Sequence, residues 1–291
     1  MSPVVAPRIE FSVMHLKPLS IERLCIHQVT LMQCDFLQSM ETLARHGVTK
    51  TAIWRDKLDE VGVDEGARIL RDLGIEVISL CAGGLLSASD PTDRRKAIDD
   101  NRRWIDQAAA VNAASMVTIT GGLEDGSRDL RSARDLACQG IAELVPHARA
   151  AGVKLALEPL HPMVCGFRSV ISTVREAGEM LRELDAPDVT GLAIDSYALW
   201  WDHNLEADLA EAAADILNFH VSDWLPQTRD IRLDRGMPGD GQIDNRKIRK
   251  WIEQVGFDGP IEVEIFSDLD WWKRDPDEVV STIVERAKTV L

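Results

Sequence analysis

Four predicted strands in the second half of the sequence each end in a side chain that can bind a metal ion. Apolar runs lead into Glu158, Asp195 and His220, and Glu264 ends the short run that begins at Ile261. Three carboxylates and one imidazole form a hard, oxygen-rich ligand set that suits Mn²⁺, Mg²⁺ or Co²⁺ and accommodates Zn²⁺. We therefore predict one divalent metal site, with manganese as the favoured ion.

Each of these residues alone has an ordinary structural explanation. A glutamate at a strand end commonly caps a helix or forms an ion pair, and a histidine in an apolar strand is commonly a hydrogen-bonded core residue. Four such residues on consecutive predicted strands, all at the same end, favour metal binding over these explanations.

The elements that must position these residues alternate between strand and helix. The expected strands are 23–27, 49–54, 76–80, 115–120, 154–158, 191–195, 216–220 and 261–264, and the expected helices are 35–46, 63–73, 90–111, 127–150, 169–184, 205–214, 245–255 and one that opens at Asp275-Pro276. Eight strand–helix pairs predict an α/β fold, a closed (β/α)₈ TIM barrel whose active site lies at the C-terminal strand ends. An open doubly wound sheet is the alternative, but no G-x-G-x-x-G follows the first strand.

One domain accounts for most of the chain. Residues 1–20 have mixed polarity and three prolines, so they read as a short N-terminal extension, and residues 21–291 form the barrel domain. The net charge of −15 argues against nucleic acid and anionic membrane as partners. Five scattered cysteines without a C-x-x-C pair, and no signal-peptide pattern, predict a cytoplasmic protein that acts on a small molecule.

The sequence resembles the xylose-isomerase-like TIM-barrel superfamily, often called sugar phosphate isomerase/epimerase. The resemblance covers most of the chain after residue 20, and the segments that carry it are 157–159, 194–197, 219–223, 234–244 and 259–265. The ordered ligand quartet and the R-G-x-P-G-x-G stretch that starts at Arg235 are specific for the superfamily but not for a substrate.

The resemblance implies a divalent-metal-dependent isomerase or epimerase of a sugar or polyol derivative. Glu158, Asp195, His220 and Glu264 match the metal ligands, and the two glutamates match the acid/base pair that moves a proton through a metal-stabilised enediolate. Arg235 matches an arginine that binds a substrate oxygen. The structural alternative for Arg235 is a loop arginine that pairs with a neighbouring aspartate.

Two positions depart from the epimerase pattern. Ala198 stands where relatives often have a substrate-binding histidine, and Val164 stands where the epimerases place a second glutamate. His161 is the expected substitute, with a backbone-bonded loop histidine as its alternative. These departures keep open a metal-dependent dehydratase or lyase that acts on a keto-sugar, a keto-inositol or a 3-keto-glycoside.

The remaining candidate substrate-binding residues follow strand ends. Trp54 and Trp224 offer aromatic faces for stacking on a sugar, and Arg55 and Lys57 offer charges for an anionic group. The structural alternatives are hydrophobic caps or a homodimer contact for the tryptophans and a solvated loop for Arg55 and Lys57. An apurinic-site endonuclease is disfavoured by the few histidines and the acidic charge, and a non-catalytic sugar-binding barrel by the intact quartet.

Overall fold

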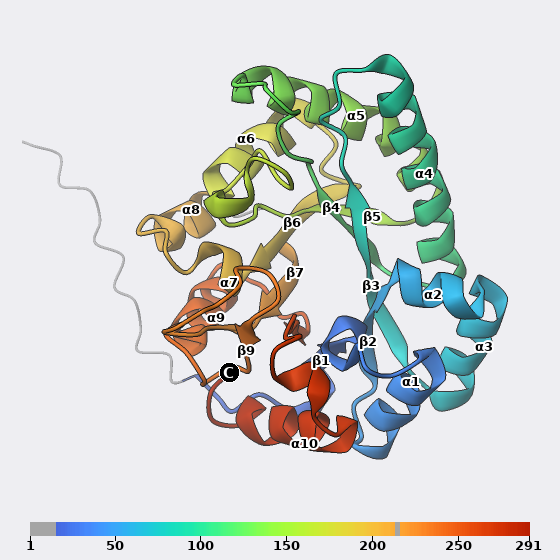
Figure 1. Ribbon diagram of the computed structural model, residues 1–291, viewed down its shortest axis with the longest axis vertical. Helices are drawn as coiled ribbons and strands as arrows, with labels where there is room; N and C mark the ends of the chain where they lie inside the picture. The colour runs from blue at the N-terminus through green and yellow to red at the C-terminus, as the bar shows by residue number, and fades with distance from the viewer. Residues whose placement is uncertain (1–15, 213–215) are drawn as a thin grey trace, which may run out of the picture.

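Short apolar strands pair in parallel and close into a barrel with helices around the outside (Figure 1). The computed structural model describes residues 16–212 and 216–291. The strands follow the order β1-β10-β7-β6-β5-β4-β3-β2, and β1 pairs with both β2 and β10 to close the ring. Their bounds are β1 Leu24–His27, β2 Lys50–Trp54, β3 Glu76–Gly84, β4 Ser115–Ile119, β5 Lys154–Leu157, β6 Thr190–Asp195, β7 Ile216–Val221 and β10 Ile261–Val263. The predicted TIM barrel is confirmed.

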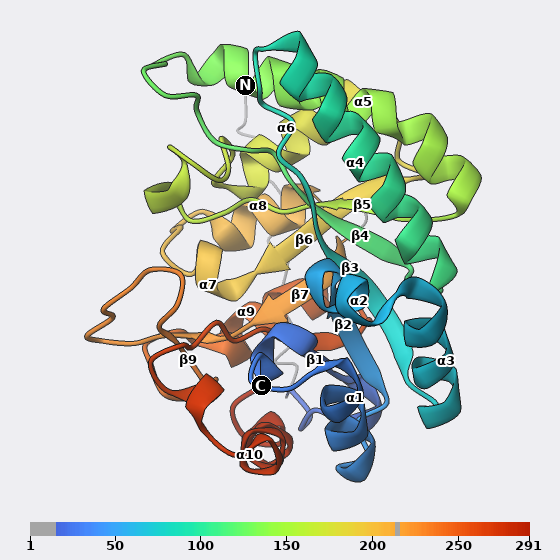
Figure 2. The ribbon, with the colours of Figure 1, turned by 45° about the vertical axis from the view of Figure 1, so that its right-hand side comes forward.

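The helices connect successive strands and cover the outer face of the barrel. Figure 2 shows α4 and α5 side by side over β3, β4 and β5. The α-helices are α1 Phe36–Arg45, α2 Arg55–Val61, α3 Val63–Leu73, α4 Pro91–Ala110, α5 Leu130–Ala151, α6 Val174–Leu184, α7 Ser196–Leu199, α8 Leu205–Ala212, α9 Asn245–Gln254 and α10 Pro276–Ala287. Short 3₁₀ helices are η1 Ile21–Arg23, η2 Gln28–Leu31, η3 Pro162–Val164 and η4 Trp271–Lys273.

Aspartates begin several of these helices in the way that the sequence predicts. Asp90 and Asp275 each accept backbone hydrogen bonds at the first turn, with a proline in that turn. Asp35 forms a capping box with Gln38 at the start of α1.

Five local expectations need correction or concern residues outside the described ranges. A helix, α2, begins directly at Arg55, where a loop was the expectation. The strand β3 continues to Gly84, and α6 begins only after its cap Thr173, because Ser169 instead bridges to Gly121. Most of the expected extension, residues 1–15, lies outside the described residues, as do residues 213–215 of the expected helix 205–214.

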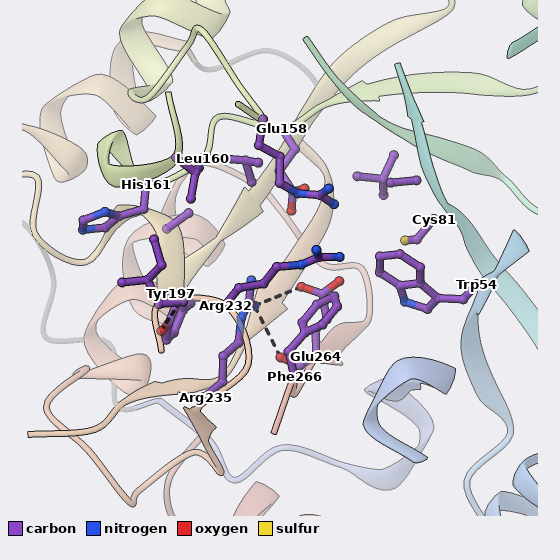
Figure 3. A pocket seen from close by; sticks show the side chains of 16 residues that line it. Trp54, Cys81, Glu158, Leu160, His161, Tyr197, Arg232, Arg235, Glu264 and Phe266 are labelled. Carbon is purple, nitrogen blue, oxygen red and sulfur yellow. Dashed lines mark hydrogen bonds and ion pairs between the residues drawn. The ribbon is translucent and has the colours of Figure 1, made fainter. Parts of the chain in front are cut away.

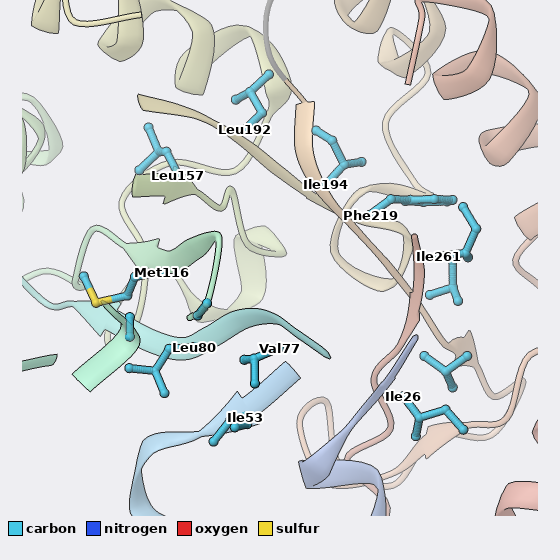
Figure 4. Close-up of a cluster of buried hydrophobic side chains, with 14 of the residues drawn as sticks. Ile26, Ile53, Val77, Leu80, Met116, Leu157, Leu192, Ile194, Phe219 and Ile261 are labelled. Atoms are coloured by element: carbon cyan, nitrogen blue, oxygen red, sulfur yellow. The ribbon is translucent and has the colours of Figure 1, made fainter. Parts of the chain in front are cut away.

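The main hydrophobic core lies between the strands and the helices (Figure 4). Its strand residues include Ile26, Ile53, Leu80, Met116, Leu157, Leu192, Ile194, Phe219 and Ile261. A second, smaller cluster consists of Cys25, Ala52, Ile78, Cys81, Val117, Ala156 and Ala193. These two sets alternate along the strands, as side chains on opposite faces of a strand must. Small residues therefore fill the inside of the barrel below the polar strand ends.

The connection from β7 to β10 contains an antiparallel pair of short strands, β8 (Asp223–Trp224) and β9 (Arg235–Gly236). The backbone N–H of Arg235 donates to the carbonyl of Phe266 at 2.8 Å, which ties β9 to the segment after β10. This pairing holds Arg235 above the strand ends. No helix in the described part of the chain is long and apolar enough to cross a membrane.

Candidate metal centre

The polar strand-end residues point into the barrel because each lies two positions after another inward-facing residue. Glu158 follows Ala156, and Asp195 follows Ala193, in the same strand register. Since the side-chain period of a strand is two, both carboxylates face the interior at the C-terminal end. Three of the four predicted ligands are at most 5% exposed, and Glu158 is 7% exposed.

Glu158, His220 and Glu264 form a tight cluster at this end of the barrel. Each offers one ligand atom, and the three atoms lie within 4.8 Å of one another. His220 Nδ1 lies 2.8 Å from Glu158 Oε1. The structure therefore brings three of the predicted ligands together, from the residue after β5, from β7 and from the residue after β10.

Asp195 reaches the cluster through Arg235. The Arg235 guanidinium donates from one nitrogen to Asp195 Oδ2 and to Glu264 Oε2, each at 3.0 Å. Figure 3 shows its contact with Glu264. The rings of Tyr197 and Phe266 flank it, at 4.3 Å and 4.9 Å from their centroids. Arg235 thus contacts two of the predicted ligands inside the barrel mouth.

The loop aspartates beside Arg235 have other partners. Asp234 accepts from Arg229, and Asp240 accepts from Arg286. The alternative in which Arg235 is a loop arginine paired with a neighbouring aspartate is therefore wrong.

The donor set fits a divalent cation. Burial raises the pKa of Asp195 to about 6, and the carboxylates of Glu264 and Glu158 add to this rise against the opposing charge of Arg235. Three buried carboxylates close together repel one another, and a cation among them would relieve that repulsion. Carboxylate oxygens and an imidazole nitrogen are ligands that Mn²⁺, Co²⁺ and Zn²⁺ accept.

A buried polar chain below the cluster is not among the sequence predictions. His27 Nδ1 lies 3.2 Å from Glu264 Oε1, and His27 Nε2 lies 3.0 Å from Glu262 Oε2. Asn218 Nδ2 donates to Glu262 Oε1 at 2.8 Å, and Ser115 Oγ donates to Asn218 Oδ1 at 2.9 Å. The chain fixes one oxygen of Glu264 from beneath.

This polar chain carries charge in a fully buried place. Burial alone would lower the pKa of His27, but its contacts with Glu262 and Glu264 raise it to about 10. Burial alone would raise the pKa of Glu262 and of Glu264, but His27 brings both below their usual range, with Arg235 also acting on Glu264. His27 is therefore held protonated between two carboxylates.

Two signals in the sequence point to these missed residues. Glu262 lies two positions before Glu264 and so shares its face of the strand. His27 is a strand-end residue of β1, which closure of the barrel places next to β10. The strand parity and the closed ring together locate both.

A pocket opens above the cluster, and some of the predicted residues line it (Figure 3). Glu158, Glu264 and Arg235 form its polar floor. Its wall is largely apolar and includes Trp54, Leu160, Val164, Ala198, Ile231 and Phe266. Two further arginines, Arg168 and Arg232, also line it.

Of the tryptophans and the histidine predicted to contact substrate, some line the pocket and one packs behind its wall. Trp54 and His161 line the pocket. Trp224 stacks on the His161 ring at 5.0 Å and on the Tyr197 ring at 4.8 Å, so it lies behind both as packing. His161 Nδ1 also accepts a hydrogen bond from the backbone of Met163 at 3.3 Å. Of the two tryptophans expected to stack on a substrate, Trp54 therefore lines the pocket, and Trp224 packs behind its wall.

Arg55 and Lys57, which were expected to bind an anionic group, are not among the residues that line this pocket. The Arg55 guanidinium lies 3.7 Å from the centroid of the Trp104 ring, and Lys57 pairs with Glu60 at 3.2 Å. The physical reason is that a helix begins directly after Trp54, so both side chains lie along the surface of α2.

The fold and sequence also match known proteins. Residues 40–283 match the family described as xylose isomerase-like TIM barrel. Inosose isomerase from Bacillus velezensis is 23% identical over 284 residues, which cover 92% of this chain and 97% of that protein.

Two solved structures share the fold. Protein SMc04130 from Sinorhizobium meliloti 1021 is 44% identical, with a TM-score of 0.90 over 93% of this chain and 99% of that chain. The IOLI protein, solved with a bound zinc atom, is 20% identical with a TM-score of 0.78, over 90% of this chain and 95% of that chain. The family match covers most of the residues and agrees with the observed barrel. The chain belongs to the xylose isomerase-like TIM-barrel family.

Proposed function

We propose that this protein is a metal-dependent isomerase or epimerase of a sugar or polyol derivative. The observation that carries the proposal is the cluster of Glu158, His220 and Glu264, whose ligand atoms lie within 4.8 Å of one another and whose two glutamates line a pocket. The similarity to an inosose isomerase supports a polyol-type substrate, and the zinc in the IOLI protein supports a divalent metal.

In this proposal Glu158, Asp195, His220 and Glu264 hold one divalent cation, with Mn²⁺ favoured and Mg²⁺, Co²⁺ or Zn²⁺ acceptable. A bound cation would polarise a substrate carbonyl and stabilise negative charge that develops on its oxygen. The surrounding pocket is apolar and partly closed to water, so electrostatic contacts within it are stronger than at the surface.

The two glutamates move the proton. Glu158 follows β5 and Glu264 follows β10, and two strands, β7 and β6, separate them in the barrel order. They therefore approach a bound molecule from different directions, as a proton transfer from one side of a carbon to another requires. His27 and Arg235 hold the two oxygens of Glu264, which fixes its carboxylate in place.

Arg235 and the pocket wall position the substrate. The Arg235 guanidinium supplies a fixed positive charge for a substrate oxygen. Trp54 offers an aromatic face for the apolar side of a ring, and His161 offers a neutral imidazole, since burial lowers its pKa.

A second candidate function is elimination by a dehydratase or lyase that uses the same metal and the same proton abstraction. The specific observation in its favour is that Ala198 and Val164 both line the pocket. The wall is therefore apolar at two positions where the epimerase pattern places hydrogen-bonding groups.

The test is turnover by Mn²⁺-loaded protein on a panel of inososes, ketoses and keto-glycosides in D₂O, followed by NMR and mass spectrometry. We expect a product of equal composition that has gained deuterium at the carbon whose proton is exchanged. Glu158→Gln and Glu264→Gln should each lower the rate about 10²–10⁴-fold. Glu41→Gln, at an exposed position on α1, is the matched control. Loss of water or of an aglycone would establish the second candidate instead, and full activity in both glutamate variants would contradict proton transfer by Glu158 and Glu264.

A further inference from the structure

Two arginines in the pocket have no role in the chemistry above. Arg168 lies in the loop between η3 and α6, and Arg232 lies in the loop between β8 and β9. Both line the pocket, together with the glutamates of the floor, and Figure 3 labels Arg232. They come from distant parts of the sequence and meet over one opening.

Neither guanidinium has a hydrogen-bonding or ionic partner within the described residues, and that of Arg232 lies 5.8 Å from the centroid of the Phe266 ring. Within residues 16–212 and 216–291, neither side chain donates a hydrogen bond or lies within ion-pair distance of a carboxylate, and the pKa of Arg168 responds only to burial and to charges nearby. By contrast, the neighbouring Arg229 pairs with Asp234. The chain has 48 acidic and 33 basic residues other than histidine, so carboxylates are abundant. Two arginines without an acidic partner in one pocket therefore indicate a binding site for an anionic ligand.

The two charges also act on each other. Burial lowers the pKa of the Arg168 guanidinium, and the positive charge of Arg232 lowers that pKa further. An anion between the two side chains would remove this repulsion. The neighbouring residues Val164 and Ile231 are apolar and line the same pocket, so the anion would bind where water competes weakly.

We propose that the substrate carries an anionic group, a carboxylate or a phosphate, that Arg168 and Arg232 bind. The proposal rests on the proposed function, because it names the substrate class for the same pocket. Arginine suits this task since its planar guanidinium forms two parallel hydrogen bonds to a carboxylate or a phosphate. The anionic end then lies at the arginine pair while the reacting carbon lies over Glu158 and Glu264.

The experiment is isothermal titration calorimetry on the Mn²⁺-loaded protein with three ketoses that differ in charge. D-Fructose is neutral, D-fructuronate carries a carboxylate, and D-fructose 6-phosphate carries a phosphate. We expect at least one anionic ketose to bind about tenfold tighter or more than fructose. The preference between the two anions identifies which group the site takes.

Variants then assign the preference to the two arginines. Arg168→Gln and Arg232→Gln should each remove about tenfold of the anion affinity and leave fructose binding unchanged. Arg232→Lys keeps the charge but loses the planar contact, so it should restore part of the affinity. Arg103→Gln, at an exposed position on α4, removes the same charge elsewhere and should change nothing.

Equal or weaker binding of both anions, including no detectable binding of any of the three ketoses, would overturn the proposal. So would arginine variants that weaken all three ketoses equally. The two hypotheses fail separately: isomerisation of a neutral ketose without anion preference removes this inference alone. Arginine-dependent anion binding without isomer formation on any substrate removes the proposed function alone.

Discussion

Removing the Glu262 side chain should destabilise the protein strongly, because its partners are buried and cannot bond to water instead. Glu262 is fully buried and accepts from Asn218 Nδ2 at 2.8 Å, and its other oxygen lies 3.0 Å from His27 Nε2. Glu262→Ala leaves the Asn218 amide without its acceptor and leaves the charged His27 imidazole with only one of its two carboxylates, Glu264, inside the barrel. We expect the metal-free variant to lose much of its free energy of unfolding.

The magnitude follows from these two contacts. Removing one partner of a buried ion pair costs about 3–5 kcal/mol. Leaving the Asn218 amide without an acceptor costs about 1–3 kcal/mol more. The total approaches the whole stability of an ordinary domain, about 5–15 kcal/mol. Glu262→Gln keeps the side-chain volume and one hydrogen-bond acceptor, so this variant should lose only about 1–3 kcal/mol of the free energy of unfolding.

Urea unfolding of metal-free protein, followed by tryptophan fluorescence, measures both losses. Glu60→Ala removes an exposed partner of Lys57 and should leave the urea midpoint unchanged. A Glu262→Ala variant within about 1 kcal/mol of wild type would refute the reasoning that the buried chain stabilises the barrel.

Three further outcomes follow from the same geometry. Gly84→Ala should lower the melting temperature far more than Gly152→Ala: both glycines have positive φ, but an added Cβ would lie 1.8 Å from a backbone oxygen at Gly84 and in open space at Gly152. Equal losses of melting temperature in the two variants would contradict this. Metal-free wild type should lose stability in thermal scans as pH rises through about 10, since folding raises the pKa values of His27 and His220 from 6.5 to about 10. The contribution of the two charged imidazoles to stability is complete only below pH 6.5, so a flat profile from pH 7 to 10.5 would contradict this. Arg235→Gln should tighten Mn²⁺ binding in calorimetry, because the guanidinium no longer competes for Asp195 and Glu264, and should slow turnover about 10²–10³-fold, because a contact with the substrate is lost. Weaker Mn²⁺ binding would contradict this.

The strand-end residues were predictable from the sequence because two simple rules locate them. Parallel strands of a barrel place their C-terminal ends on one face, and each strand directs every second side chain inward. Glu158, His220 and Glu264 follow both rules and meet as expected. Asp195 follows them too, but its contact with Arg235 depends on the β8–β9 pair, which carries little signal in the sequence.

The remaining site residues depend on contacts that cross the whole chain. His27 and Glu262 are 235 positions apart and become neighbours only when β1 pairs with β10. Arg168 and Arg232 lie in irregular loops, whose paths tertiary packing decides. Arg55, which the sequence suggested for an anionic group, lies outside the pocket lining for a local reason, since the chain turns directly into α2 there.

Metal analysis of purified protein tests the central claim most directly. We predict about one Mn, Co, Mg or Zn ion per chain in wild type, and loss of that ion from Glu158→Gln and His220→Ala variants that remain folded by circular dichroism. His203→Ala, at an exposed loop histidine, should keep the metal. A wild-type protein that holds no metal, even after reconstitution with each ion, would contradict the metal centre and the function built on it.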